Sequence, residues 1–252
     1  MAALKPHQSR YWLTPRVDDP ERCAVEVRPL CDLSAAAPAL REQGTHVVST
    51  DEMTGIQALE RAAPTLPMWS GHPERREFEY VRHGTQALIA SFDVATGKVL
   101  PPSVGPTRTE ADCAAHVERV LACDPGAEWV FVTDQLDTHK SETLVRLVAR
   151  ECRITDDLGT KEHSGILRSM ATRAAFLSDP AHRIRFVSTP KHCSWLNQIE
   201  RWCSILVRKL LRRASFTSTN DLRTRLLAFV DSFNRTMAHP FKWTYRGLPL
   251  HA

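Results

Sequence analysis

The fold of this chain is decided by two stretches, His46-Val47-Val48-Ser49-Thr50-Asp51 and Trp129-Val130-Phe131-Val132-Thr133-Asp134. Each is a short apolar run that ends in an aspartate. A continuous apolar run of this length is typical of a strand that is covered on both faces of its sheet. Because ligands of open α/β sheets bind beyond the carboxyl ends of the strands, neighbouring strands of this kind would bring Asp51 and Asp134 together.

Further elements surround these strands and predict an α/β fold with a mixed sheet and helices on its faces. Strands are expected at 45–50, at 85–93, from 99 and at 184–187, with 85–100 forming a hairpin. Apolar residues at helical spacing cover 109–122, 141–152, 166–177, 196–213 and 219–236. Pro29 and Pro38 limit the segment 19–43 to one or two short helices. The segment 51–80 is polar and has no regular period.

The predicted domain organisation has three parts. Residues 1–44 form an N-terminal linker with short helices, residues 45–236 form the main domain, and residues 237–252 form a C-terminal tail. With 252 residues, the chain is long enough for one large domain or two small ones.

The composition excludes several classes of protein. With 42% hydrophobic and 25% charged residues, the chain has the balance of an ordinary globular protein. No run approaches the ~20 apolar residues of a membrane helix, and the N-terminus lacks the apolar core of a signal peptide. We therefore expect a cytoplasmic protein with no membrane partner. The seven cysteines are odd in number and form no C-x-x-C pair, which argues against a zinc ribbon or a disulfide framework.

Basic residues are concentrated toward the C-terminus. Residues 190–252 contain eleven Lys/Arg and three Asp/Glu, whereas residues 1–189 contain 22 and 26. Lysines and arginines that neutralise phosphates release counterions, so a polyanion is one partner that fits this segment. A solvated helix face explains the charge alone equally well.

A third acidic residue, Glu200, opens the helix expected at 196–213. It flanks the apolar stripe of that helix, and a glutamate in the first turn suits the helix dipole. Close carboxylates repel one another unless a cation lies between them, and oxygen-only ligation favours Mg²⁺ or Mn²⁺ over zinc. Taken alone, each aspartate is better explained as the cap of a following helix or turn. For Glu200 the alternative is a solvated helix residue, and its basic neighbours argue against that: Arg201, Arg208, Lys209, Arg212 and Arg213.

Three motifs, in this order, carry a resemblance to a known family. They are Thr50-Asp51-Glu52-Met53-Thr54-Gly55-Ile56-Gln57, Thr133-Asp134-Gln135-Leu136-Asp137-Thr138-His139-Lys140-Ser141 and Trp195-Leu196-Asn197-Gln198-Ile199-Glu200-Arg201. Together with the closing His239-Pro240-Phe241 and Trp243-Thr244-Tyr245-Arg246-Gly247, they resemble DDE transposases, and specifically the bacterial insertion-sequence branch related to mariner elements. The resemblance extends over residues 5–247.

The resemblance implies an RNase H-like fold with Asp51 on the first strand, Asp134 at the end of the fourth and Glu200 on the helix after the fifth. It implies that these three residues hold two Mg²⁺ (or Mn²⁺) ions, which promote DNA strand cleavage and strand transfer by in-line displacement. It also implies double-stranded DNA as the partner, at the terminal repeats of an element and at the target, and a homodimer on paired DNA ends.

Two features depart from the family pattern. Asp134 and Glu200 lie 66 positions apart, farther than in many relatives, and residues 156–182 are expected to be the added segment. Family members carry a helix-turn-helix module before the catalytic region, and this chain begins where that module would end. The alternative to an active catalytic domain is therefore a truncated, non-catalytic remnant that binds DNA. A different RNase H-like nuclease is a third possibility, against which the C-terminal motifs argue.

Further residues are candidates for DNA contact. His139 could contact phosphate, shuttle protons or hydrogen-bond its own loop. Asn197 could orient Glu200 or cap its helix, and Trp195 could stack on a base or pack beneath the helix; capping and packing are favoured. The remaining candidates are basic: Lys140, Lys191, Arg201, Arg208, Lys209, Arg212 and Arg213.

Overall fold

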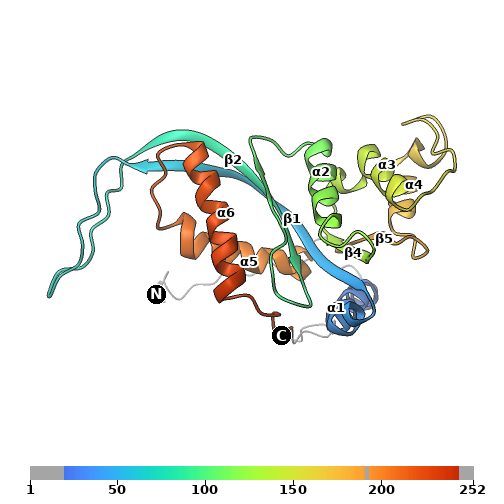
Figure 1. The fold of residues 1–252 in the computed structure, drawn as a ribbon, viewed down its shortest axis with the longest axis horizontal. Helices are drawn as coiled ribbons and strands as arrows, with labels where there is room; N and C mark the ends of the chain where they lie inside the picture. Colours follow the sequence, from blue (N-terminus) through green and yellow to red (C-terminus); the bar gives the residue numbers. More distant parts are fainter. Residues whose placement is uncertain (1–19, 191–192, 244–252) are drawn as a thin grey trace, which may run out of the picture.

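The computed structural model describes residues 20–190 and 193–243, with side chains from residue 25 onward. A five-stranded mixed sheet in the order β3-β2-β1-β4-β5 lies at its centre (Figure 1). Its strands are β1 (Thr45–Arg61), β2 (Tyr80–Asp93), β3 (Ser103–Gly105), β4 (Glu128–Thr133) and β5 (Ile184–Ser188). β1, β2 and β3 pair antiparallel, whereas β4 pairs parallel with both β1 and β5. The two apolar runs are therefore neighbours, as the sequence predicted.

Helices cover both faces of the sheet (Figure 1). One face packs against α2 (Glu110–Leu121), α3 (Glu142–Glu151) and α4 (Met170–Leu177). The other packs against α1 (Pro20–Glu42), α5 (Gln198–Leu206) and α6 (Thr219–Thr236). Short helical turns are η2 (Asp137–Lys140), η3 (Ile166–Arg168), η4 (Ser194–Leu196) and the π-helix η5 (Val207–Leu211).

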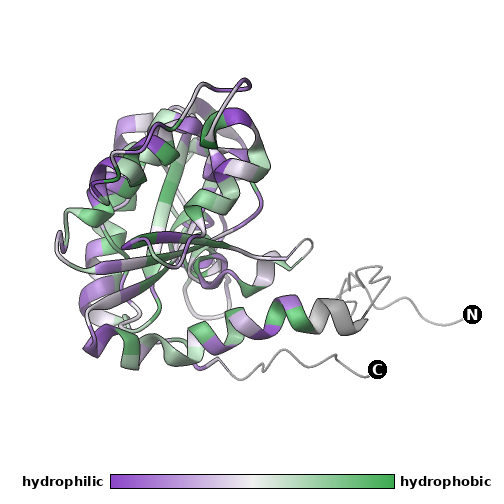
Figure 2. Ribbon diagram, turned by 90° about the vertical axis from the view of Figure 1, so that its right-hand side faces the viewer, coloured by the Kyte–Doolittle hydropathy of each residue, from purple (hydrophilic) through white to green (hydrophobic). Residues whose placement is uncertain are grey.

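The pleat of β1 decides which side chains meet which helical layer. Val48 belongs to the core formed with α2 and α3, whereas Val47 belongs to the core formed with α1. Because successive side chains of a strand point to opposite faces, Asp51 lies on the face of α5 and Glu52 on the face of α2. Figure 2 shows that the helices around the sheet carry both hydrophobic and hydrophilic residues, as expected of helices with one face on a core.

The first helix is longer than predicted. Residues Pro20–Glu42 form one helix despite Pro29 and Pro38, so the expectation of one or two short helices was wrong. Proline removes a backbone hydrogen bond, but burial of inward residues offsets that loss. Val27, Leu30 and other apolar residues of α1 pack against the sheet.

The polar segment after Asp51 is also more regular than predicted. β1 does not end at Asp51 but continues to Arg61, paired along its length with β2. The register shifts between Met53 and Ile56, beyond which Ile56 and Ala58 face the α6 side of the core. Residues 62–79 continue the hairpin as a protruding arm (Figure 1), with exposed apolar side chains that include Leu66, Met68, Trp69 and Phe78.

The segment predicted as an insertion contributes to the core. Its helical part folds as η3 and α4, and Leu167 and Leu177 are buried in the cluster beneath α3. Among the described residues, no helix is long and apolar enough to cross a membrane.

Candidate active site

Asp51 and Glu200 line one groove between β1 and α5. The groove has a volume of ≈ 600 Å³, and its wall also includes Glu52, Arg208 and Arg212. Asp51 lies within β1, where it pairs with Ala90 of β2, and Glu200 lies in the first turn of α5. The groove therefore combines acidic residues of β1 and α5, which are far apart in the sequence, with two cationic residues.

Asp134 follows the last residue of β4, beside β1 in the sheet. Its Oδ1 accepts a hydrogen bond from the backbone N of Leu136 at 2.9 Å and lies 3.0 Å from Nδ1 of His139. The hydrogen bond from His139 lowers the pKa of Asp134 below its usual value and outweighs burial, which acts in the opposite direction. Asp134 is therefore held as an ionised carboxylate.

The charges of Asp134 and Glu200 both act on Asp51. Burial raises the pKa of Asp51 from 3.8 to about 7, opposed by a hydrogen bond from the Glu52 amide, while the charges of Asp134, Glu52 and Glu200 add to the rise. Burial also raises the pKa of Cys203, on the wall of the groove, to about 12, and the charges of Asp51 and Glu200 contribute. Asp51 and Glu200 therefore share one groove, and Asp134 lies at the end of the neighbouring strand.

His139 connects the loop after β4 with β1. Its Nε2 lies 3.2 Å from Oε1 of Glu52, and its Nδ1 faces Asp134. Burial alone would lower the pKa of His139, but hydrogen bonds with Asp134, Cys113 and Glu52 raise it well above its usual value. A protonated His139 between two carboxylates fixes the orientation of Asp134 relative to β1.

Asn197 fixes the start of α5 on β1. Its Nδ2 donates to the carbonyl of Thr50 at 2.9 Å, and its Oδ1 accepts from the hydroxyl of Ser49. The same hydroxyl of Ser49 accepts from the backbone N of Ile199 at 2.9 Å. These contacts join the turn that carries Glu200 to the residues immediately before Asp51.

A π-helix continues α5 and carries cationic side chains to the groove. The backbone N of Arg212 donates to the carbonyl of Val207 at 2.9 Å, the wide turn of η5. Arg208 and Arg212 line the groove of Asp51, and Arg208 also borders a second cavity of ≈ 590 Å³ with Lys209 and Arg213. All four basic residues are exposed, so they form a continuous cationic edge beside the carboxylates.

Comparison with protein families shows the family to which the chain belongs. The family model described as DDE superfamily endonuclease matches residues 46–223, which include Asp51, Asp134 and Glu200. The chain belongs to the DDE superfamily endonucleases. A comparison with curated proteins finds no match.

Solved structures of Mos1 mariner transposase share the fold of this DDE endonuclease. Its catalytic domain superimposes with a TM-score of 0.53 at 12% identity, covering 95% of this chain and 90% of that one. The paired end complex with Mn gives a TM-score of 0.53 at 14% identity, covering 95% and 62%. The paired-end complex with the left transposon end gives 0.53 at 13% identity, covering 96% and 62%. This chain thus spans about three-fifths of the transposase in those complexes, and the RNase H-like fold is confirmed.

The burial of two predicted DNA contacts in this DDE endonuclease contradicts a direct role. His139 is 2% exposed and Asn197 is 1% exposed, because both are engaged by neighbouring elements. Asn197 is the N-cap residue of α5, as expected, but its side chain makes no cap hydrogen bond, and the hydroxyl of Ser49 bonds the helix amide of Ile199 instead. Asn197 orients the turn of Glu200 through β1.

Other residues that were predicted to contact DNA are less buried than His139 and Asn197 or lie outside the described part of the chain. Trp195 is 45% exposed and stacks on Trp243, so it does not pack beneath the helix as favoured. The guanidinium of Arg201 lies 5.2 Å from the ring centre of Phe241, and Lys140 Nζ donates to Gln135. Lys191 lies outside the described residues.

Glu52 and Cys113 are site residues that the sequence analysis missed. Glu52 follows Asp51 and therefore points to the opposite face of the same strand, a signal that period-2 alternation could have given. Cys113 lies on α2, and nothing in its spacing connects it with β1. Its proximity to Glu52 and His139 depends on how α2 packs on the sheet.

Proposed function

We propose that this chain is a transposase catalytic domain that cleaves DNA strands and transfers them at the ends of a mobile element. Family membership supports an endonuclease of the DDE class. The proposal is carried by the groove that Asp51 and Glu200 share and by the position of Asp134 at the end of β4, the strand that pairs with β1. Assignment to the bacterial insertion-sequence branch stays a prediction, as do the domain boundaries and the cytoplasmic location.

The donor set fits two divalent cations with hard oxygen ligands. Asp51, Asp134 and Glu200 offer carboxylate oxygens alone, the type that Mg²⁺ and Mn²⁺ prefer. Burial and the adjacent carboxylates disfavour the ionised form of Asp51, and a cation held among them would favour it. Bound Mg²⁺ would supply activation of the attacking hydroxyl and stabilisation of the leaving oxygen of a phosphodiester. The Mos1 complex with Mn supports a metal of this class.

The surrounding side chains position this machinery. Asn197 and Ser49 hold the first turn of α5 against β1, which sets the place of Glu200. His139 keeps Asp134 ionised and oriented. Arg208 and Arg212, on the wall of the same groove, would neutralise a phosphate entering it.

Double-stranded DNA is the proposed partner. The exposed cationic edge of η5 continues the groove, and phosphate contacts of this kind supply most of the sequence-independent affinity for DNA. The Mos1 paired-end complex with the left transposon end supports binding to element ends. Terminal repeats and target DNA are accordingly the proposed substrates.

A homodimer on DNA is part of the same proposal. The protruding arm presents Trp69 at 58% and Phe78 at 79% exposure, with Met68 at 70%. Large apolar side chains exposed on one protruding arm suit a contact surface between protein chains. A second copy of the chain is the occupant that a two-ended DNA substrate requires.

The test is cleavage of pre-nicked and terminal-repeat DNA with and without Mg²⁺. We expect Mg²⁺-dependent products from the wild type, and their loss in Asp134→Asn. Asp137→Asn is the matched control, because Asp137 is an exposed aspartate of the same loop. Binding of DNA without any Mg²⁺-dependent cleavage would favour the non-catalytic remnant instead, and unchanged cleavage by Asp134→Asn would remove the catalytic assignment.

A further inference from the structure

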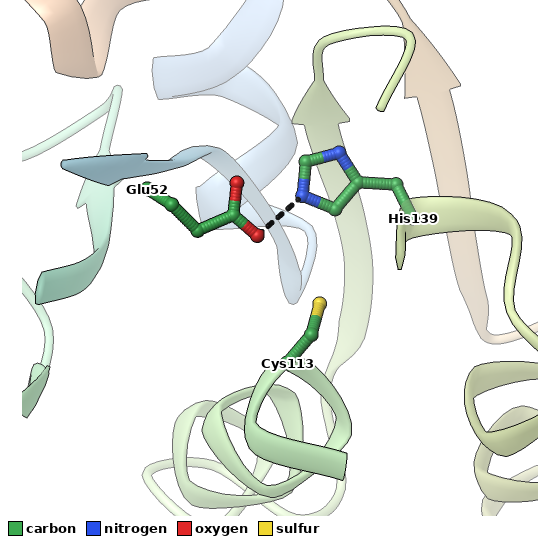
Figure 3. A group of neighbouring side chains, drawn as sticks. All are labelled: Glu52, Cys113 and His139. Carbon is green, nitrogen blue, oxygen red and sulfur yellow. Dashed lines mark hydrogen bonds and ion pairs between the residues drawn. The ribbon is translucent and has the colours of Figure 1, made fainter. Parts of the chain in front are cut away.

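A second group of potential metal ligands lies on the opposite face of β1 from Asp51. Glu52 of β1, Cys113 of α2 and His139 of η2 offer an oxygen, a sulfur and a nitrogen that all lie within 4.8 Å of one another. Figure 3 shows the Glu52 carboxylate and the Cys113 sulfur directed toward the ring of His139. The side chains of Glu52 and His139 are 2% and 1% exposed, and Cys113 is 2% exposed.

One oxygen in this cluster lacks a partner. Oε1 of Glu52 lies 3.2 Å from Nε2 of His139, whereas Oε2 is buried and has no hydrogen-bond partner among the described residues. A buried carboxylate oxygen that has lost water without gaining a partner is unfavourable. A cation bound in the cluster would satisfy it.

We propose that Glu52, Cys113 and His139 bind one thiophilic divalent cation, with Zn²⁺ as its representative. Thiolate, imidazole and carboxylate are the three ligand types of zinc sites. With Zn–S near 2.3 Å and Zn–N and Zn–O near 2.1 Å, a tetrahedral ion separates its ligand atoms by about 3.3–3.6 Å. The 3.2 Å between Oε1 of Glu52 and Nε2 of His139 is close to this spacing. Because all three ligand atoms lie within 4.8 Å of one another, no pair has to close by more than roughly 1.5 Å.

The far side of the imidazole supports the same assignment. Nδ1 of His139 lies 3.0 Å from Oδ1 of Asp134, so Nε2 is the nitrogen that faces the cluster. A carboxylate on the other ring nitrogen fixes the orientation of a metal-ligating histidine and raises its basicity. A cation at Nε2 would take the place of the proton that His139 holds there beside Glu52, and its binding would release that proton.

This site is distinct in chemistry from the one proposed for catalysis. Asp51, Asp134 and Glu200 form an oxygen-only set that suits Mg²⁺, whereas a thiolate ligand selects softer ions. The pleat of β1 directs Asp51 and Glu52 to opposite faces of the sheet. The inference rests on the geometry of three side chains and does not require that the chain cleaves DNA.

The test is metal binding by the full chain after metals have been stripped from it. Zn²⁺ is titrated by calorimetry in excess Mg²⁺, and Co²⁺ is titrated by absorption, which reports thiolate-to-cobalt charge transfer. We expect one Zn²⁺ per chain and a charge-transfer band. Cys113→Ser and Glu52→Gln should each weaken Zn²⁺ binding by more than the ~10–100-fold that loss of an outer-shell partner costs.

Two cysteine variants are the matched controls. Cys203→Ser, on the wall of the groove, and Cys123→Ser, which is exposed after α2, should leave Zn²⁺ affinity unchanged. Zn²⁺ binding that survives Cys113→Ser, or that is lost in Cys203→Ser, would overturn the proposal. So would the absence of a charge-transfer band in the wild type, a result that does not depend on whether any variant folds. Because no DNA is present, this failure is separate from a failure of cleavage.

Discussion

Replacement of Asn197 by alanine is the perturbation that most directly probes how Glu200 is positioned. The amide of Asn197 is 1% exposed and bridges α5 to β1 through Thr50 and Ser49. Alanine removes both bonds and leaves the freed groups of β1 in a space that water does not readily enter. The backbone amide of Ile199 keeps its bond to Ser49, so α5 loses its side-chain bridge but not its start.

The magnitude follows from these two bonds. Leaving a buried polar group without a partner costs about 1–3 kcal/mol, so the variant should lose about 3 kcal/mol of unfolding free energy. For a chain of this size, each kcal/mol corresponds to roughly 2–4 °C, which predicts a melting temperature about 6–12 °C lower. A displacement of the turn of Glu200 by about 1 Å would also reduce cleavage by about a hundredfold.

Thermal unfolding and the cleavage rate at saturating Mg²⁺ are the two measurements. Asn220→Ala is the matched control, because Asn220 is an exposed asparagine in the first turn of α6. The control should melt within about 1 °C of the wild type, since surface substitutions change stability by about 0.5 kcal/mol or less. If Asn197→Ala behaves like this control in both assays, the hydrogen bonds of Asn197 between α5 and β1 do not position Glu200.

The remaining predictions concern the pH dependence of stability, the salt dependence of DNA binding and the cost of replacing two glycines. Because folding raises the pKa of Asp51 from 3.8 to about 7, the folded chain keeps a proton that the unfolded chain has released between these values. Stability in chelator therefore falls as pH rises through this window, and Asp51→Asn should melt above the wild type at pH 8 but not at pH 4; coincident melting curves would contradict the burial that raises the pKa of Asp51. Replacing both Arg208 and Arg212 by glutamine should weaken DNA binding and lower the slope of log K against log salt by about two, measured by fluorescence anisotropy; an unchanged slope would place DNA elsewhere. Gly97→Ala should cost well over 2 kcal/mol in a thermal melt, because its new Cβ would lie 2.0 Å from the backbone after α6 at a φ of +72°. Gly55→Ala, with φ +65° and nothing within 4 Å, should cost only the strain of about 1 kcal/mol, and equal losses would refute the close approach.

The parts of the fold that the sequence predicts well are those in which both faces of an element are buried. Val47, Val48 and residues 129–132 are apolar without interruption because helices cover β1 and β4 on each side. Asp51 and Asp134 could be recognised as candidates because each directly follows one of these apolar runs. Parallel pairing of β1 with β4 then brings two of the three carboxylates together.

The elements that the sequence analysis misjudged depend on tertiary partners. β1 continues past Asp51 because β2 pairs with it along the whole hairpin, although its exposed outer part lacks an apolar pattern. α1 continues through two prolines because its inward residues pack on the sheet. Neither the pairing of β2 with β1 nor the packing of α1 on the sheet can be read from the local sequence. Local propensity therefore predicted shorter elements in both places.

The candidate site also contains some residues that the sequence predicts and others that depend on tertiary packing. Asp51, Asp134 and Glu200 could be predicted from their places on the elements and from the resemblance. The partners of Glu52 could not, since Cys113 and His139 come from α2 and η2 and meet only when both pack on one face. The side-chain hydrogen bonds of Asn197 were misread for a related reason, because they cross to β1 rather than turn back to its own helix.

Binding of Mn²⁺ tests the central claim most directly, because it reports on the carboxylates without requiring the correct DNA. Free Mn²⁺ can be followed by electron paramagnetic resonance during titration into the wild type, Asp51→Asn, Asp134→Asn and Glu200→Gln. The account predicts two ions per wild-type chain and loss of at least one ion in each variant, while Asp137→Asn binds like the wild type. Undiminished binding by all three variants would contradict it.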